Sequence, residues 1–133
     1  MSEKNMIIGI DIDNTLTNSH SPWSVASGDT IDINIEKRLL LADERQGIEV
    51  LSNHKGKIIL VTARHEEYRN VTVQWLQLKQ IKYEKIVMRN FRFSGGVFNL
   101  NEYLKYKYIA CLEHNIKYML DDDEKVVNML NSY

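Results

Sequence analysis

Four short runs of apolar, mostly β-branched residues recur along the chain, and polar or charged residues follow each run. They cover residues 6–10, 58–61, 85–88 and 118–120. Runs of this length that end in polar residues are typical of buried β-strands. Between the runs, apolar residues recur at helical spacing. This spacing predicts helices over about residues 33–54, 66–80 and 102–114, and a short last helix that contains Val126, Val127 and Leu130.

The alternation of strands and helices determines the expected fold. Strands separated by helices form βαβ units, whose strands lie parallel in one sheet. We therefore expect a doubly wound, Rossmann-like α/β fold with helices on both faces of the sheet. Gly47 lies inside the first helical pattern and costs up to ~1 kcal/mol there, so we expect that helix to break at this residue. At 133 residues the chain has the length of one domain with its own core, spanning residues 1–133.

Composition is that of an ordinary globular protein, with 44% apolar and 26% charged residues. A net charge of −1 argues against binding of polyanions over the whole surface, although it allows a local basic patch. The single cysteine, Cys111, cannot form an internal disulfide, which suits a reducing cytoplasm. No apolar stretch approaches the ~18 residues of a membrane span, and no signal-peptide pattern opens the chain. We expect a cytoplasmic protein without a membrane partner.

The first strand ends at two carboxylates. Asp11 and Asp13 follow the apolar run and, two residues apart, point to the same side of an extended backbone. Ligands of open α/β sheets bind outside the carboxyl ends of the strands, so chemistry is expected here. Two like charges this close repel each other, and a divalent cation is the usual compensation. The segment alone is equally consistent with a strand that runs into an acidic turn.

Two further strand ends carry polar groups. The run Thr62-Ala63-Arg64-His65 follows the second strand and could hold a phosphate, or Thr62 or His65 could simply cap the next helix. Three aspartates follow the fourth strand. We expect Asp121 and Asp122 to be ligands of a hard cation and Asp123 to cap the last helix.

Two lysines near the start of the preceding helix are candidates for the cation of this site. Residues Tyr108, Ile109 and Leu112 fall three, four and seven positions after Lys105, which is the spacing of a normal core face. From Lys107 the spacing fits a core face less well. We therefore expect Lys105, rather than Lys107, to face the carboxylates.

Together these motifs resemble the haloacid dehalogenase (HAD) superfamily of phosphohydrolases. Asp11-Ile12-Asp13-Asn14-Thr15-Leu16-Thr17 is similar to its first motif and Ile59-Leu60-Val61-Thr62 to its second. Lys105 is similar to its third motif and Met119-Leu120-Asp121-Asp122 to its fourth. The resemblance covers nearly the whole chain and implies a HAD-like fold. The gaps after the first and second motifs hold only about 40 residues each, so we expect no cap domain and an open site.

The resemblance also implies a mechanism and a cofactor. Asp11 would attack phosphorus to form an aspartyl-phosphate, while Asp13 would protonate the leaving oxygen and then activate the hydrolytic water. Thr62 and Lys105 would stabilise charge on the transferred phosphate. The implied ligands of Mg²⁺ are Asp11, the backbone carbonyl of Asp13, Asp121 and Asp122.

A narrower resemblance concerns the substrate. Val61-Thr62-Ala63-Arg64 followed by Glu67-Tyr68-Arg69 is similar to the 3′-phosphatase domains of bacteriophage-type polynucleotide kinases and to small 5′(3′)-nucleotidase-like proteins. The kinase phosphate-binding loop is absent from the sequence. Asp123 stands where the polynucleotide branch commonly has arginine. The implied substrate is a nucleotide or a polynucleotide 3′-phosphate end, and an open site also suits closure by a second subunit of a homo-oligomer.

The segment 79–93 interleaves basic and aromatic residues. Such a pattern can hold a nucleic-acid strand through phosphate contacts and base stacking, but it is also typical of a solvated turn beside a strand. Arg89 and Arg92 follow a strand end, and so we expect them to bind substrate together with Thr62, Ala63 and Arg64.

Two alternative functions stay open. A phospho-acceptor signalling module of the receiver type combines the same groups, but its acceptor aspartate lies at a middle strand end, where this chain has Thr62. A HAD phosphatase that acts on sugar or protein phosphates would use the residues named above on a different substrate.

Overall fold

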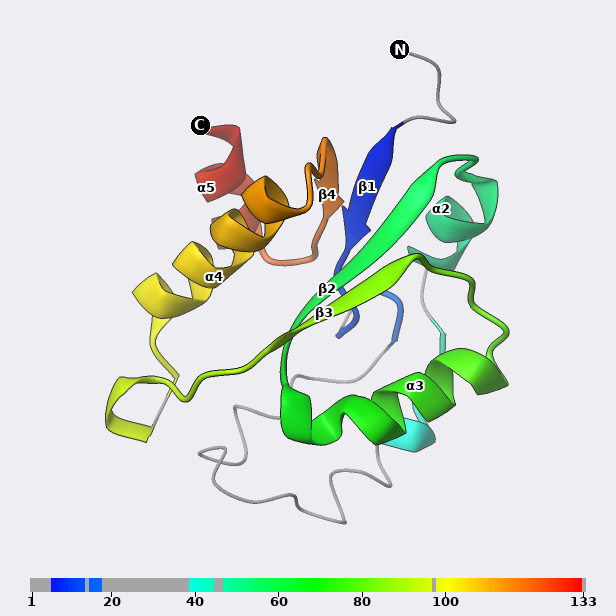
Figure 1. Ribbon diagram of the computed structural model, residues 1–133, viewed down its shortest axis with the longest axis horizontal. Helices are drawn as coiled ribbons and strands as arrows, with labels where there is room; N and C mark the ends of the chain where they lie inside the picture. Colours follow the sequence, from blue (N-terminus) through cyan, green and yellow to red (C-terminus); the bar gives the residue numbers. More distant parts are fainter. Residues whose placement is uncertain (1–5, 14, 18–38, 45–46, 97, 133) are drawn as a thin grey trace.

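Four parallel strands form the centre of the molecule (Figure 1). The computed structural model describes residues 6–13, 15–17, 39–44, 47–96 and 98–132. The strands are β1 (Ile7–Ile10), β2 (Lys57–His65), β3 (Lys85–Arg89) and β4 (Tyr118–Leu120), in the order β3-β2-β1-β4. The predicted parallel sheet is confirmed.

Helices cover both faces of this sheet, as expected for a doubly wound fold (Figure 1). Those of the first face are α2 (Gly47–Asn53) and α3 (Arg69–Leu78), and those of the second face are α4 (Leu100–Glu113) and α5 (Glu124–Asn131). Two short 3₁₀ turns, η3 (Glu66–Tyr68) and η4 (Ser94–Gly96), precede α3 and α4. Among the described helices, none is both long enough and apolar enough to cross a membrane.

Strand β2 shows why both faces need cover. Its residues alternate between two apolar clusters: Ile58 and Leu60 pack with Trp75 of α3, whereas Ile59 and Val61 pack with Ala110 of α4. Apolar side chains on both sides of a strand are characteristic of a parallel sheet buried between helices.

Strand β2 is also longer than the apolar run that predicted it. It continues through residues 62–65, three of which are polar, with a register shift against β3 between Val61 and His65. Arg64 lies in this extension with its side chain buried and hydrogen-bonded. Polar residues can remain in a buried strand when their side chains find partners of this kind. The extension carries the end of β2 into the candidate site.

The described residues between the second and third motifs, from β2 to α4, contain no cap domain. Between β2 and α4, the described residues form η3, α3, β3, η4 and their connections. Residues 18–38, in the first gap, lie outside the described residues, and so does the start of the helix predicted for 33–54.

The predicted break at Gly47 is confirmed, because α2 begins at this glycine. The amide of Gly47 donates a hydrogen bond of 3.0 Å to the carbonyl oxygen of Thr15, in the loop that follows β1. A Cβ atom at residue 47 would lie 2.4 Å from that oxygen. The backbone approach at this point therefore requires glycine, and it fixes the loop of the first motif against α2.

Replacement of Gly47 by alanine should lower the free energy of unfolding by about 1–3 kcal/mol, because the new methyl group must push Thr15 away. Urea unfolding of G47A measures the loss. The matched control is S52A in the same helix, where the side chain is exposed and the change should stay within about 0.5 kcal/mol. Equal losses in the two variants would contradict the steric explanation.

Candidate active site

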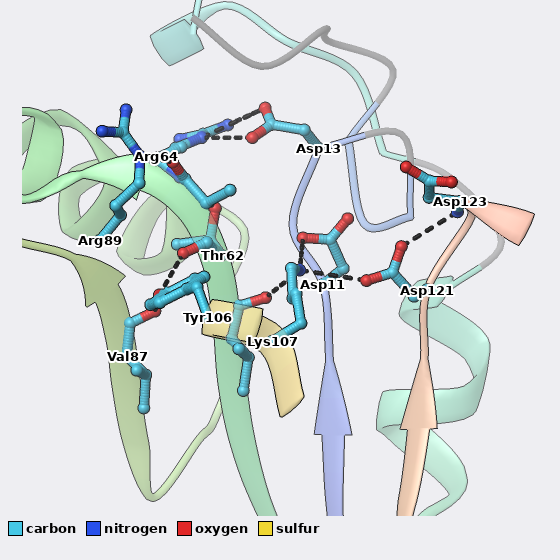
Figure 2. A network of polar contacts seen from close by, with 12 residues as sticks. Asp11, Asp13, Thr62, Arg64, Val87, Arg89, Tyr106, Lys107, Asp121 and Asp123 are labelled. Carbon is cyan, nitrogen blue, oxygen red and sulfur yellow. Dashed lines mark hydrogen bonds and ion pairs between the residues drawn. The ribbon is translucent and has the colours of Figure 1, made fainter. Parts of the chain in front are cut away.

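Polar side chains from several elements meet at the carboxyl edge of the sheet (Figure 2). Asp11 follows β1, Thr62 and Arg64 belong to the end of β2, and Asp121 follows β4. Helix α4 contributes Lys107 from the second face. All five side chains are buried, although four of them are charged types. Buried charges need partners, and the pairing of these groups defines the site.

The ammonium group of Lys107 lies between two carboxylates. Its Nζ atom donates to Oδ1 of Asp11 at 2.9 Å, to Oδ2 of Asp121 at 3.0 Å and to the carbonyl oxygen of Val61 at 3.0 Å. These three contacts use all the donors of an ammonium group. Burial by itself lowers the pKa of Lys107, but Asp11 and Asp121 outweigh it and raise that pKa well above its ordinary value. The lysine is therefore charged.

The structure places Lys107 at the carboxylates and leaves Lys105 exposed, so the expected choice between the two lysines was wrong. Residues two apart point about 200° away from each other around a helix, so both cannot face the site. The expectation assumed that Ile109 and Leu112 face the core. Both are exposed, at 38% and 59%, and the buried face of α4 consists of Tyr103, Lys107 and Ala110.

Three carboxylates beside Lys107 form a candidate cation site. Oxygen atoms of Asp11, Asp121 and Asp122 all lie within 4.8 Å of one another. Burial raises the pKa of Asp11 well above its ordinary value, and Asp121 and Asp13 raise it further, although Lys107 acts in the opposite direction. Burial and then Asp121 also raise the pKa of Asp122.

The charges of this group suit a divalent cation. When ionised, the three carboxylates carry one negative charge each, and the single positive charge of Lys107 leaves two of them uncompensated. Carboxylate oxygens are the ligands that Mg²⁺ prefers. Asp123 has the separate role expected of it, since its Oδ1 accepts the amide of Lys125 and caps α5.

Asp13 is paired with Arg64 instead of belonging to this cluster. Oδ1 of Asp13 accepts Nη2 of Arg64 at 2.9 Å, and the guanidinium Nε lies 3.2 and 3.1 Å from Oδ1 and Oδ2. Nη1 of Arg64 donates to Oγ1 of Thr72, which in turn donates to the carbonyl oxygen of Tyr68. Arg64 was expected to bind substrate, but the structure uses it to hold Asp13 against α3.

The sequence reasoning counted Thr72 among the residues of the narrower resemblance but gave it no role in the site. It lies in the middle of α3, and its role depends on Arg64, eight residues before it. A polar residue on the buried face of an otherwise apolar helix was the available signal, because such a group needs a buried partner.

Thr62 is fully buried beside the charged groups. Its Oγ1 accepts the backbone amide of Arg64 at 3.1 Å, and its carbonyl oxygen accepts the hydroxyl of Tyr106 at 2.6 Å. His65, not Thr62, caps the following turn, because its Nδ1 accepts the amide of Glu67. No hydrogen bond from the Thr62 hydroxyl to another described residue accompanies these contacts.

The other three expected substrate-binding residues have internal partners. Ala63 is buried, and its carbonyl oxygen accepts Nε of Arg89 at 2.9 Å. Arg89 also donates to the carbonyl oxygen of Phe91 and lies over the ring of Phe93, 4.4 Å from its centre. Arg92 pairs with Glu67 at 2.7 Å. These contacts hold the loop after β3 and do not bring the two arginines to the carboxylates.

Comparison with known proteins gives a match to solved structures alone. No protein family and no curated protein matches the sequence. A chain of the Pnkp1/Rnl/Hen1 RNA repair complex matches over 98% of this chain and 40% of its own length, with a TM-score of 0.62 and 21% identity. A second Pnkp1/Rnl/Hen1 structure gives a TM-score of 0.61 and 22% identity over 96% of this chain and 42% of that one.

The chain shares the doubly wound α/β fold of these Pnkp1/Rnl/Hen1 chains. The HAD domain of effector protein Lem4 from Legionella pneumophila also aligns, with a TM-score of 0.47 and 22% identity over 98% of this chain and 82% of that domain. This chain spans less than half the length of the Pnkp1/Rnl/Hen1 chains that it matches. The similarity to the Pnkp1/Rnl/Hen1 chains establishes the fold alone.

Replacement of Lys107 by methionine should destabilise the fold by about 3–5 kcal/mol, because it leaves Asp11 and Asp121 buried without their cation. The free energy of unfolding in urea, measured with EDTA present, reports the loss. K105M is the matched control, and its exposed side chain predicts a change within about 0.5 kcal/mol. A larger loss for K105M than for K107M would contradict the assignment.

Proposed function

We propose that this chain is a Mg²⁺-dependent phosphomonoester hydrolase that acts through an aspartyl-phosphate on Asp11. The observation that carries the proposal is the placement of Lys107 between Asp11 and Asp121, with Thr62 and the Arg64-bound Asp13 at the same edge of the sheet. Two carboxylate groups with different partners, a buried cation and a hydroxyl are the parts that phosphoryl transfer needs.

Asp11, Asp121 and Asp122 would hold the cation, because their oxygens form the cluster described above. When bound there, Mg²⁺ would neutralise the phosphate so that an anionic nucleophile can approach it. The backbone carbonyl of Asp13 stays a predicted additional ligand.

Asp11 is suited to the role of nucleophile by the unequal use of its two oxygens. Oδ1 accepts the ammonium of Lys107, whereas no described residue donates a hydrogen bond to Oδ2. In the proposed first step, a carboxylate oxygen of Asp11 forms a bond to phosphorus as the bond from phosphorus to the leaving oxygen breaks. Lys107, in place of the expected Lys105, would stabilise the charge on the transferred group through its positive charge alone, because Asp11, Asp121 and the carbonyl oxygen of Val61 accept all of its donors. Thr62 would act at the same strand end.

Asp13 transfers the protons in this scheme, and Arg64 positions it. Asp13 gives a proton to the leaving oxygen in the first step. In the second step it takes a proton from the water that attacks phosphorus, and the bond between phosphorus and Asp11 breaks to release inorganic phosphate. The two-pronged contact with Arg64 fixes the plane of the Asp13 carboxylate, which a single-point contact would not do.

A nucleotide or a polynucleotide 3′-phosphate end is the substrate class we favour. Support comes from the sequence resemblance around residues 61–69 and from the fold shared with a chain of an RNA repair complex. The absence of a cap between β2 and α4 in the described residues also suits a large substrate.

Phosphate release should require both Asp11 and Mg²⁺. We expect release from a 3′-phosphorylated oligonucleotide or from deoxynucleoside monophosphates with Mg²⁺, and loss of it with EDTA. D11N should fall below a hundredth of the wild-type rate while it unfolds at a similar urea concentration, because asparagine keeps the shape of the side chain but not the anionic nucleophile.

The outcomes separate the alternatives. Preference for the oligonucleotide identifies an end-cleaning phosphatase, and preference for mononucleotides identifies a nucleotidase. A stable phospho-form of Asp11 without turnover would support the receiver alternative instead. Residual D11N activity above the stated level would contradict the nucleophile assignment.

Substitution of Arg64 should lower kcat/KM by a factor that depends on the leaving group of the substrate. R64K keeps the charge but loses the two-pronged contact, so Asp13 would protonate an alkoxide leaving group less well. We expect kcat/KM for the 3′-phosphorylated oligonucleotide to fall by about 10²-fold or more. The loss should be much smaller for p-nitrophenyl phosphate, whose leaving group departs without a proton.

The parameter kcat/KM is chosen because it covers the steps up to departure of the leaving group and excludes hydrolysis of the intermediate. T72V is the control, since it removes one contact of Arg64 and leaves the contact with Asp13 intact. Equal losses of R64K on the two substrates would mean that Arg64 acts on something other than proton transfer.

A further inference from the structure

Positive charge is concentrated in one part of the chain. Residues 54–92 contain nine Lys and Arg but three Asp and Glu, whereas the rest of the chain contains eight Lys and Arg and fifteen Asp and Glu. The overall net charge of −1 is the sum of this basic segment and an acidic remainder. A local excess of this kind affects which partners a surface attracts.

The arginines of this segment are already engaged, as described above for Arg64, Arg89 and Arg92, and Arg69 pairs with Glu66 at 2.7 Å. The lysines are different. Four of them are exposed and form no ion pair with a described residue: Lys55, Lys57, Lys82 and Lys85. The unpaired positive charge of the segment therefore lies on these lysines.

Three of these lysines line a cavity of about 660 Å³ at the amino ends of β2 and β3. The cavity is bordered by Lys55, Lys57 and Lys82, together with Tyr83 and Gln80. Among the described residues that line it, Glu84 is the only acidic one. We call this feature the basic cavity.

The basic cavity does not serve to neutralise the catalytic carboxylates. Lys57 is at the start of β2 and Thr62 is five residues further along, which at ~3.3 Å per residue separates them by about 16 Å. Surface charges separated by more than the Debye length of ~8 Å are largely screened in physiological salt. The lysines are therefore too far from the carboxylates to compensate their charge, and any anion that they attract would bind at their own end of the sheet.

We propose that the basic cavity binds the phosphodiester backbone of a single-stranded polynucleotide, upstream of the end held at Asp11. Three ammonium groups can contact successive phosphates, and the half-buried ring of Tyr83 offers a surface on which a base can stack. An acidic peptide would use the lysines but not the ring. The volume is within the range of sites that hold small organic groups such as a nucleotide.

The location predicts which nucleotide is bound. At ~3.4 Å per stacked nucleotide, a separation of about 16 Å corresponds to roughly five nucleotides. Oligonucleotides shorter than this would reach the carboxylates without reaching the basic cavity. This part of the inference rests on the proposed action at a polynucleotide end, whereas binding itself does not.

Binding is tested with 12-nucleotide single-stranded RNA and DNA that carry a 5′ fluorophore and a 3′-hydroxyl end, so that no hydrolysis is needed. We expect K55Q/K57Q/K82Q to weaken binding of one or both by roughly tenfold or more at low salt. The slope of log affinity against log salt should fall by about 2, since each lost phosphate contact contributes ~0.7 for single strands. Fluorescence anisotropy measures both quantities.

The charge-matched control is K105Q/K117Q/K125Q, which removes three exposed lysines from other parts of the surface. Equal weakening by the control, an unchanged salt slope, or no binding by the wild type would each overturn the proposal. Competition by polyglutamate as effective as that by unlabelled oligonucleotide would also overturn it, in favour of an acidic protein partner.

A length series separates this inference from the proposed hydrolase activity. For 3′-phosphorylated substrates, the triple lysine variant should raise KM for the 12-mer and leave the 3-mer unchanged. If the wild type shows no hydrolysis but binds the oligonucleotide in a lysine-dependent way, the proposed hydrolase activity is refuted. The proposed binding at the basic cavity then still holds. Equal effects on the 3-mer and the 12-mer would refute the upstream placement.

Discussion

The fully buried ammonium of Lys107 is the contact on which the rest of the candidate site depends. It joins three strands and a helix, because its partners follow β1, belong to β2 and follow β4, while its own backbone is in α4. Burial of a lysine is costly unless its charge and all its donors are satisfied. The carboxylates of Asp11 and Asp121 meet that condition, and the lysine in turn allows them to lie close together. The packing of α4 against the sheet and the positions of the two carboxylates therefore depend on each other.

Charge is divided unequally at this edge of the sheet. Asp13 has a full partner in Arg64, whereas Asp11, Asp121 and Asp122 share the single charge of Lys107. Asp11 and Asp121 are buried, and uncompensated buried charge raises the free energy of the folded state. The uncompensated negative charge is confined to the three carboxylates, and this is the reason to consider them a cation site.

The sequence predicted the elements and the strand ends because both follow from local patterns. Apolar runs located β1 to β4, and the polar residues after them located Asp11, Thr62 and Asp121. It failed on the lysine because helix orientation was inferred from apolar residues that turned out to be exposed. It also assigned free guanidinium groups to substrate, although Arg64 finds Asp13 fifty-one residues earlier in the chain. Pairings over such separations depend on the fold and leave no local pattern.

The separation between acidic and basic ends has a consequence for how an anionic substrate could bind. A cluster of carboxylates repels a phosphorylated end, and a cation held there offsets part of this repulsion for the terminal phosphate alone. A polynucleotide carries further charges along its backbone, which the carboxyl edge cannot attract. Binding energy gained at a distance from the reacting bond can compensate for an unfavourable local contact. The lysines at the amino ends of β2 and β3 are placed to supply that energy. They are too far from Asp11 to compensate the negative charge of the carboxylates there. Attraction and chemistry can thus lie at opposite ends of the same sheet.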